Sequence, residues 1–396
     1  MNAVQQPLVA VGHNERPLPA LPTPVSARVA LLGTGTVGSA VLQRLAQWQG
    51  TDLGERLRLV HVANSRHACG DRYGLSPMAA AQQLQASGRI AVLESVAPAL
   101  AGQDVRIVVD ATASDAIAAR HAAWLAQGIH VVTACKLGQG TSLARWRTIR
   151  AACAHGDSHY GDSATVGAGL PLLRSIRELR AGGDRIHAIA GVLSGSLAWL
   201  FHHYDGLRPF SGFVREARDA GYTEPDPRED LSGEDVRRKL LILARAAGVE
   251  LEADAVAVDS LVPAALAALD RGAVDIALPR LDAPLRARYA DAYKRGGKLR
   301  FVARLDCDAG GGAMARVGLE SLPGGHPLAG GAGTDNRVAI WSDRYREQPL
   351  LIQGPGAGAE VTAAALLDDV LAILRRNDQA AAAAKNASIG CGCRNT

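Results

Sequence analysis

Apolar runs alternate with helix-period segments in the first part of the chain. The first run covers residues 28–32 and ends at a glycine. Apolar side chains then recur at helical spacing, at Val37, Ala40, Val41, Leu45 and Trp48. Further runs cover 57–63, 106–112 and 129–133, with another helix-period segment near 114–127. Strands that alternate with helices predict an α/β fold with a doubly wound parallel sheet.

The pattern changes after about residue 160. Residues 299–306 and 313–322 alternate like half-buried antiparallel strands, which predicts a second, mixed α/β domain. Residues 349–374 again indicate a strand, a glycine turn and a helix, which favours a return to the first domain. The predicted division is a flexible N-terminal extension (1–27), a first domain (28–162), a second domain (163–336), a returning segment (337–375) and a flexible tail (376–396).

Composition narrows the class of protein. With 48% hydrophobic and 21% charged residues, the chain can bury a large core, which excludes intrinsic disorder and a small disulfide scaffold. The net charge of +4 comes without a basic block, so we expect a small-molecule ligand and neither nucleic acid nor a membrane surface as partner. The six cysteines show no CxxC pair, which favours reduced thiols in the cytoplasm. No signal peptide or spanning segment is indicated.

A glycine-rich turn follows the first predicted strand. It reads Gly33, Thr34, Gly35, Thr36, Val37 and Gly38, a GxGxxG between a strand and a helix. In a Rossmann-type domain these glycines make the tight turn, leave room for a pyrophosphate and let the helix pack closely on the strand. The flanking elements favour dinucleotide binding over an ordinary glycine turn.

The residues after the second predicted strand bear on the choice of cofactor. They read Ala-Asn-Ser-Arg, ending at Arg66, without the acidic residue that would hold the ribose 2′-hydroxyl of NAD. Arg66 can instead meet a 2′-phosphate, which favours NADP and leaves NAD possible. The alternative is a solvated surface arginine.

Lys136 lies at the carboxyl end of another predicted strand, the edge where open α/β sheets bind ligands. Its neighbour Cys135 allows two interpretations. It could be a nucleophile for acyl transfer, or a small, partly buried thiol without a chemical role, which is the commoner state.

Charged residues are densest between 222 and 239, in YTEPDPREDLSGEDVRRK. Two prolines predict a rigid loop, and Ser232 is a candidate cap for the helix that follows. Asp235 and Lys239 are four residues apart, so they share one margin of that helix. A lysine beside Glu224, Asp230 and Asp235 can stay protonated and act as a proton donor in carbonyl reduction. The alternative is a structural salt-bridge network.

These motifs together resemble those of homoserine dehydrogenases, from about residue 28 to 375. The stretches that carry the resemblance are GTGTVG, ANSR, VDATAS, TVGAGLP, GVLSGS, GYTEPDPREDLSGEDVRRKLLILAR, GTDN and QGPGAGAEVTA, in that order. Such enzymes interconvert L-homoserine and L-aspartate 4-semialdehyde with NAD(P). The resemblance is to the monofunctional form, without an aspartate kinase or a C-terminal regulatory domain, so we expect no allosteric inhibition by threonine.

The resemblance implies roles for particular residues. Lys239 would be the proton donor and Lys136 the second active-site lysine, near both nicotinamide and substrate. The implied substrate-binding residues are Glu224, Asp235, Tyr222, Asp230, Gly195 and Ser196. Thr112 and Gly358 would complete the cofactor site. The second domain would also form a homodimer.

A monovalent cation, typically sodium, is also implied by the resemblance. Its ligands would be backbone carbonyls of Ser163, Val166, Ala168 and Leu170. The chain departs from the family pattern at two positions: it has Cys135 where an asparagine usually precedes the first lysine, and Ser163 where an acid is common at the cation site. Two other functions stay open: an NADP-binding protein that has lost catalysis, and a semialdehyde dehydrogenase that uses Cys135 as its nucleophile.

Overall fold

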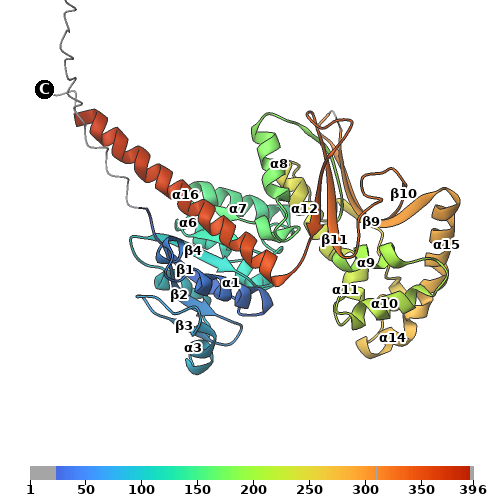
Figure 1. The fold of residues 1–396 in the computed structure, drawn as a ribbon, viewed down its shortest axis with the longest axis horizontal. Coiled ribbons are helices and arrows are strands. Elements are labelled where there is room, and N and C mark those ends of the chain that lie inside the picture. Colours follow the sequence, from blue (N-terminus) through green and yellow to red (C-terminus); the bar gives the residue numbers. More distant parts are fainter. Residues whose placement is uncertain (1–23, 309, 393–396) are drawn as a thin grey trace, which may run out of the picture.

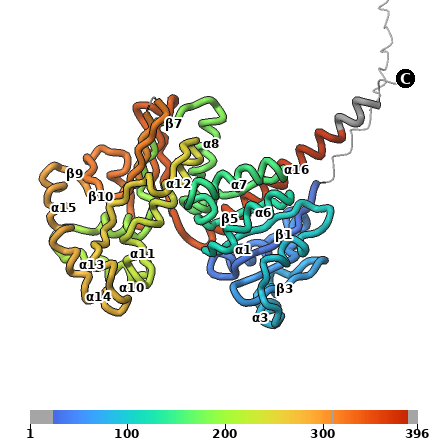
Figure 2. The backbone as a smooth tube through the Cα atoms, turned by 180° about the vertical axis from the view of Figure 1, so that it is seen from behind, coloured from blue at the N-terminus to red at the C-terminus, as the bar shows by residue number. Residues whose placement is uncertain are grey.

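The computed structural model describes residues 24–308 and 310–392, with side chains described as far as residue 385. The chain forms two units, each built around its own sheet (Figure 1). The first unit contains the N-terminal elements, and the second contains most of the middle of the chain. The long C-terminal helix lies along the first unit, as the view from behind also shows (Figure 2).

The first sheet has the strand order β3-β2-β1-β4-β5-β6. Its strands are β1 (Ala27–Leu32), β2 (Leu57–Ala63), β3 (Ala68–Gly70), β4 (Val105–Asp110), β5 (His130–Thr133) and β6 (Tyr160–Gly161). All neighbours pair in parallel except β3, which is antiparallel to β2 at the edge. The predicted parallel sheet is therefore confirmed, with one antiparallel edge strand.

Helices cover both faces of this sheet, which confirms the doubly wound prediction. The helices of the unit are α1 (Thr36–Gln47), α2 (Asp52–Glu55), α3 (Ala80–Ala86), α4 (Val96–Ala99), α5 (Asp115–Ala118), α6 (His121–Ala126) and α7 (Leu143–His155). One face packs against α1 and the C-terminal helix, and the other against α4, α6 and α7. The single helix expected near 114–127 is split into α5 and α6.

The second sheet has the strand order β12-β11-β7-β9-β10-β8. Its strands are β7 (Ile186–Val192), β8 (Val256–Val258), β9 (Gly297–Cys307), β10 (Ala313–Pro323), β11 (Asp335–Ser342) and β12 (Leu350–Pro355). Neighbours are antiparallel except β8 and β10. The pairing of β9 with β10 confirms the antiparallel strands expected at 299–306 and 313–322.

Helices pack on this sheet around the largest apolar core of the described residues. They are α8 (Leu172–Ala181), α9 (Gly195–His203), α10 (Phe210–Asp219), α11 (Arg228–Leu231), α12 (Glu234–Ala246), α13 (Ala264–Ala267), α14 (Val274–Ala277) and α15 (Asp282–Lys294). Together with the sheet they form the predicted mixed α/β unit. Among them α12 contacts both β9 and α8, so its position is fixed from two sides.

The C-terminal helix α16 (Ala359–Gly392) corrects two predicted boundaries. Strands β11 and β12 belong to the second sheet because β11 pairs with both β7 and β12, so the return to the first unit begins with α16 and not at residue 337. The predicted tail is helical through residue 392, since its alanines favour helix. Asp378 also holds this segment, because its carboxylate accepts from the backbone N–H of Val25 at 2.8 Å and pairs with Arg56 at 2.7 Å.

Two other predictions concern the ends of the chain and the membrane. The flexible extension expected at 1–27 lies outside the described residues as far as residue 23. Within the described chain, no helix is both long enough and apolar enough to cross a membrane.

Candidate active site

Three charged side chains meet where the two units touch. Asp235, in the first turn of α12, pairs through Oδ2 with Lys239 Nζ at 2.9 Å and through Oδ1 with Lys136 Nζ at 3.3 Å. Lys239 Nζ also donates to the backbone carbonyl of Leu193 at 2.7 Å. The structure thus brings together both predicted lysines and one predicted acid, from segments far apart in the sequence.

Burial and charge act in opposite directions on this cluster. Burial lowers the pKa of Lys239, and the positive charge of Lys136 lowers it further, while Asp235 opposes both. Burial alone would raise the pKa of Asp235, but Lys239 and Lys136 outweigh it and hold that pKa well below its usual range. The side chain of Lys239 is 11% exposed and that of Asp235 is 45% exposed, so the cluster is open to a ligand on its acidic side.

The start of α12 differs from the prediction that Ser232 caps it. The helix begins at Glu234 after Gly233, whose φ of 78° lies in the left-handed region. A Cβ there would lie 2.9 Å from the ring of Phe301, so both the backbone conformation and the packing require glycine at this position. The Ser232 hydroxyl instead accepts from the backbone N–H of Glu234 at 3.2 Å and donates to the carbonyl of Glu229 at 2.8 Å.

Asp230, in α11, connects the loop of residues 222–227 to the start of α9. Its carboxylate accepts from the Ser196 hydroxyl at 2.7 Å and from the backbone N–H of Glu224 at 2.8 Å. Burial raises the pKa of Asp230, and these two hydrogen bonds oppose the shift. Asp230 therefore positions the backbone of Glu224, whose exposed carboxylate makes no hydrogen bond or ion pair within the described chain.

Ser194, Gly195 and Ser196 begin α9 beside this loop. The Ser194 hydroxyl accepts from the backbone N–H of Leu197 at 3.2 Å and so caps the helix. A Cβ at Gly195 would lie 3.2 Å from the carbonyl oxygen of Thr334, in the GTDN segment. Tyr222 lies at the rim, exposed on one side and packed on Trp199, with ring centroids 5.6 Å apart. These predicted pocket residues are thus neighbours.

Arg245 is a buried residue of the site that the sequence analysis missed. Its guanidinium donates to the carbonyls of Gln139, Thr141 and Leu251, the second of these at 2.7 Å. It therefore ties the loop that carries Lys136 to α12. A buried arginine without a carboxylate partner has no local sequence signal, although its place on the apolar side of α12 is a clue.

Cys135 is buried next to Lys136, with 2% of its surface exposed. Burial raises the pKa of its thiol to about 11, and the nearby charge of Asp110 contributes in the same direction. A thiol in this state is a poor nucleophile at neutral pH because it is rarely ionised. The structure therefore favours the interpretation of Cys135 as a packing residue.

The glycine turn lies between β1 and α1, as the GxGxxG pattern predicts. Gly33 has a φ of 94°, and a Cβ there would come within 2.8 Å of the Ala111 carbonyl oxygen. A Cβ at Gly38 would overlap the carbonyl oxygen of Gly33, whereas a Cβ at Gly35 would meet nothing within 4 Å. Gly33 and Gly38 thus shape the turn, and Gly35 leaves open space before a helix start that has no side-chain cap. Such a start offers free N–H groups to phosphates.

The other predicted cofactor residues surround the same sheet edge. Thr112 follows β4, and both its backbone N–H and its hydroxyl donate to Asp110. Arg66 follows β2 with an exposed side chain, in a turn where the Asn64 side chain accepts from the backbone N–H of Arg66 at 2.8 Å. Gly358, with a φ of 132°, precedes α16, whose residue Ala359 packs in the same cluster as Val37.

The predicted cation ligands lie in a tight loop after β6. Ala168 has a φ of 49°, rare for a residue other than glycine, and Gly167 before it has a φ of 75°. The backbone carbonyls of Val166 and Ala168 accept no hydrogen bond from the described residues, although both residues are buried. Unpartnered carbonyl oxygens suit a hard cation. The Leu170 carbonyl accepts from the backbone N–H of Leu172 at 2.8 Å.

Ser163 is held by an acid from α16 that the sequence did not single out. Its backbone N–H and hydroxyl donate to Asp369 at 2.9 and 2.8 Å. Burial raises the pKa of Asp369 from 3.8 to about 6, and the neighbouring charge of Asp162 adds to this. Asp162 itself is buried and pairs with Arg177 at 2.6 Å.

This raised pKa predicts that Asp369→Asn stabilises the protein above pH 6. Between pH 4 and 6 the folded protein holds a proton on Asp369 that the unfolded chain has lost, so stability falls as the pH rises through this window. The loss is at most about 3 kcal/mol, and asparagine avoids it. Thermal melts at pH 8 should show a higher midpoint for Asp369→Asn, with no gain at pH 4. The exposed neighbour is the control: Asp368→Asn should show no such difference.

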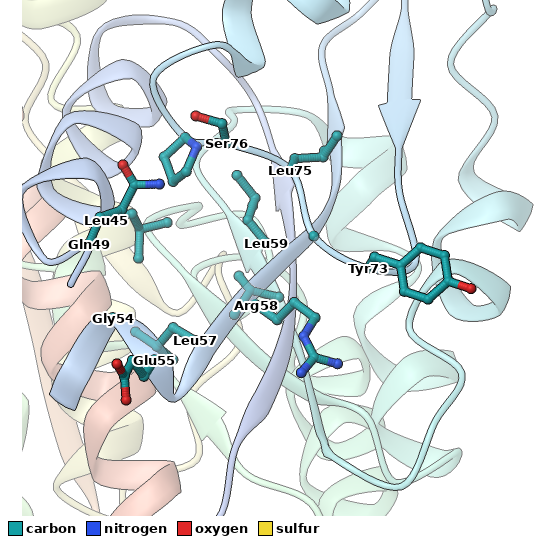
Figure 3. A pocket seen from close by; sticks show the side chains of 13 residues that line it. Leu45, Gln49, Gly54, Glu55, Leu57, Arg58, Leu59, Tyr73, Leu75 and Ser76 are labelled. Carbon is teal, nitrogen blue, oxygen red and sulfur yellow. The ribbon is translucent and has the colours of Figure 1, made fainter. Parts of the chain in front are cut away.

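A cavity of about 360 Å³ in the first unit lies apart from these residues (Figure 3). Its walls include Leu57, Arg58 and Leu59 from the first half of β2, together with Tyr73 and Leu75. The glycine turn and Arg66 follow the opposite, carboxyl ends of β1 and β2. The cavity therefore does not belong to the candidate active site.

Comparisons with known proteins match both units. Residues 33–160 match the family model described as homoserine dehydrogenase, NAD binding domain, and residues 171–371 match the model described as homoserine dehydrogenase. The chain is 35% identical over 370 residues to homoserine dehydrogenase of Emericella nidulans, covering 88% of this chain and 98% of that protein.

Two further similarities extend the comparison. The chain is 37% identical over 350 residues to the chloroplastic bifunctional aspartokinase/homoserine dehydrogenase 2 of Zea mays, covering 87% of this chain but only 38% of that relative. A crystal structure of a Candida auris protein of unknown function superposes with a TM-score of 0.81 at 34% identity, covering 89% of this chain and 99% of that one.

Proposed function

Because this chain belongs to the homoserine dehydrogenase family, whose members are oxidoreductases that act on a CH–OH group, we propose that it interconverts L-homoserine and L-aspartate 4-semialdehyde. The reaction oxidises the primary alcohol of homoserine to an aldehyde while NAD(P)⁺ becomes NAD(P)H, with release of one proton. The proposal includes a role in the biosynthesis of threonine, methionine and isoleucine. The aspartokinase activity in the name of the longer Zea mays relative, of which this chain spans 38%, lies outside the proposal.

The observation that carries the proposal is that Lys239 and Lys136 both pair with the carboxylate of Asp235, beside the carboxyl edge of the first sheet. A carbonyl reduction needs a proton donor at the oxygen that gains negative charge. The bound nicotinamide supplies or accepts the hydride. Lys239 supplies the proton to the aldehyde oxygen in reduction, and its neutral amine accepts the proton from the alcohol in oxidation.

The remaining site residues orient the substrate. Glu224 and Asp235 are suited to the substrate ammonium because both present carboxylate oxygens, and Glu224 has no competing partner within the described residues. Lys136 follows β5 at the carboxyl edge of the first sheet and pairs with Asp235, so in the proposal it contacts both the cofactor and the substrate. Tyr222, Asp230, Gly195 and Ser196 shape the pocket wall, the last two through the start of α9.

The cofactor in this proposal is NADP, bound by the glycine turn, Thr112 and Gly358. Its 2′-phosphate is assigned to Arg66, whose exposed side chain has no partner within the described residues. NAD remains the second candidate because it lacks only that phosphate. The name of the matched NAD binding domain supports a nicotinamide cofactor in general.

We expect Arg66→Ala to raise KM for NADP about 10–100-fold, since it removes a charge-assisted contact worth about 1.5–3 kcal/mol. KM for NAD should change less than twofold because NAD has no 2′-phosphate. Steady-state rates with each cofactor measure both values. Equal losses for NADP and NAD would contradict the assignment, and Arg72→Ala, on the loop after β3, is the control.

The proposal also includes a monovalent cation bound by the loop after β6. Sodium is the cation used to test it. The carbonyls of Val166 and Ala168 are its best-supported ligands because neither accepts a hydrogen bond within the described residues. Ser163 and Leu170 complete the set. Such a cation would hold the loop before α8 in place, and the proposal gives it no part in proton or hydride transfer.

Two other functions are less well supported. A Cys135-dependent semialdehyde dehydrogenase needs an ionised and accessible thiol, which burial opposes. We expect Cys135→Ser to keep most of the homoserine-dependent activity, measured as kcat, whereas an acyl-transfer enzyme would lose it. A silent NADP-binding protein would bind cofactor without turnover, but it gives no reason for the Lys136, Asp235 and Lys239 cluster.

The proposal also includes a cytoplasmic homodimer formed through the second unit. The four cysteines whose side chains are described are all free, which agrees with a reducing compartment. Edge strand β12 has one unpaired side and carries Leu351, which is exposed. Sedimentation equilibrium of the full chain measures the subunit number.

The test of the function is a spectrophotometric assay of NAD(P)H formation. Purified full-length protein receives L-homoserine and either NADP or NAD at mildly alkaline pH, with sodium or with tetramethylammonium as the only monovalent cation. Homoserine-dependent absorbance at the reduced-nicotinamide band is the expected result, with higher rates in sodium. Cofactor binding without any such signal would contradict the proposal and favour the silent protein.

A further inference from the structure

We propose that Asp110 is a positioning residue that holds the cofactor-facing Thr112 and the Lys136 loop in a fixed geometry. The inference rests on the proposed function for the roles of Thr112 and Lys136. Asp110 ends β4 and is fully buried, so it cannot contact the substrate or the cofactor itself. Its effect has to pass through the groups that it binds.

The two carboxylate oxygens of Asp110 serve different segments. Oδ1 accepts from the backbone N–H of Thr112 at 3.0 Å and from its hydroxyl at 2.6 Å. Oδ2 accepts from the hydroxyl of Thr133 at 3.0 Å, on the neighbouring strand β5. One side chain therefore fixes the ends of two adjacent strands at the ligand-binding edge of the sheet.

Thr133 connects Asp110 to the loop that carries Lys136. Its hydroxyl donates to Asp110 and accepts from the backbone N–H of Cys135 at 2.8 Å. Cys135 directly precedes Lys136. Only a side chain with a hydroxyl can donate and accept at once in this place, so serine can replace threonine here and valine cannot.

His121 and Tyr160 extend the hydrogen-bond network of Asp110. His121 Nε2 lies 3.1 Å from Asp110 Oδ2, and His121 Nδ1 lies 2.9 Å from the Tyr160 hydroxyl. Burial holds the pKa of Tyr160 well above its usual value, so its hydroxyl keeps its proton. A carboxylate oxygen can only accept, so His121 Nε2 donates to Asp110, and the buried carboxylate then has four donors.

The lysine loop also packs directly on this network. A Cβ at Gly138 would overlap the Tyr160 hydroxyl and lie 3.2 Å from His121 Nδ1. The loop that carries Lys136 therefore contacts the hydrogen-bond network at two places, at Tyr160 and at Thr133. A change in the network moves Lys136 relative to Thr112, and a shift of about 1 Å can lower a rate about 100-fold.

The test compares Thr133→Val with Thr133→Ser in the full-length protein. Valine has the shape of threonine but removes both hydrogen bonds, and serine keeps them. We expect Thr133→Val to raise the Kd for NADPH about 10-fold and to lower kcat about 10–100-fold, with Thr133→Ser within about threefold of wild type. NADPH binding is measured by fluorescence titration, which needs no turnover.

Stability is measured alongside, with Ser158→Ala as the control. Ser158 also has a buried hydroxyl, which donates to the Leu125 carbonyl at 2.8 Å, but it lies outside the network. A Thr133→Val protein that melts lower, as Ser158→Ala does, yet keeps wild-type Kd, kcat and KM would overturn the inference. If Thr133→Val does not fold, His121→Met removes one donor to Asp110, and an unchanged NADPH Kd in that variant would overturn it equally.

The two proposals fail in different ways. If the wild-type protein binds NADPH but does not oxidise homoserine, the proposed function fails. The positioning inference is then still decided by the NADPH Kd of Thr133→Val relative to Thr133→Ser.

Discussion

Replacing Lys239 with methionine is expected to lower kcat about 1,000-fold in both directions, because the proton donor is lost while the packing of an aliphatic chain is kept. The Kd for NADPH should stay within about threefold of wild type, since Lys239 contacts Asp235 and the Leu193 carbonyl and not the glycine turn. Stopped-flow or steady-state rates and a fluorescence titration measure the two quantities.

The pH dependence of the wild-type enzyme adds a second readout for Lys239. Burial lowers its pKa, so the ammonium loses its proton at a lower pH than an exposed lysine does. Reduction of the semialdehyde needs the protonated form and should slow as the pH rises through that pKa, while oxidation of homoserine should accelerate. The exposed Lys294→Met is the control. A Lys239→Met enzyme with kcat within threefold of wild type would remove Lys239 from the proton transfer.

The second large effect is expected at the glycine turn, where one alanine substitution should weaken NADPH binding and another should prevent folding. A Cβ at Gly35 meets nothing within 4 Å, so Gly35→Ala should fold and melt like wild type. The methyl group would nevertheless fill the space left for the pyrophosphate. We expect NADPH binding to weaken about 100-fold, a loss of about 2.7 kcal/mol.

Gly38→Ala should instead prevent stable folding of the first unit. Its Cβ would overlap the Gly33 carbonyl, and neither backbone segment can move without separating α1 from β1. Circular dichroism melts and NADPH titrations distinguish the two variants. Gly212→Ala, within α10 and with open space around the glycine, is the control. Normal NADPH affinity in Gly35→Ala would contradict the placement of the pyrophosphate.

Local patterns were sufficient for much of the fold and for part of the site. The apolar run at 57–63 coincides with β2, and the spacing of Asp235 and Lys239 along a helix is enough to predict their ion pair. Both predictions depend only on the geometry of one element, which the nearby sequence determines. The GxGxxG turn is also a local prediction, because it depends only on the glycines and on the strand and helix next to them.

Contacts between distant segments could not be predicted in this way. Nothing near Lys136 indicates that it reaches Asp235, and the carbonyl of Leu193 has no side-chain signal at all. Arg245 resembles a surface arginine in sequence because its partners are backbone carbonyls. Strand β11 shows the same limit at the level of the sheet, since its apolar residues 338–341 are compatible with a strand but do not indicate which sheet it joins.

The course of the chain also constrains how the site can open. The backbone passes between the two units twice, once between β6 and α8 and once between β12 and α16 (Figure 1). Two covalent crossings restrict twisting, so an opening motion would be a swing about the line that joins them. Such a swing would separate Lys136 from Asp235 only by also breaking the hydrogen bonds of Arg245, on α12, to the loop that carries Lys136. Departure of the product and breakage of that ion pair would then be the same mechanical event.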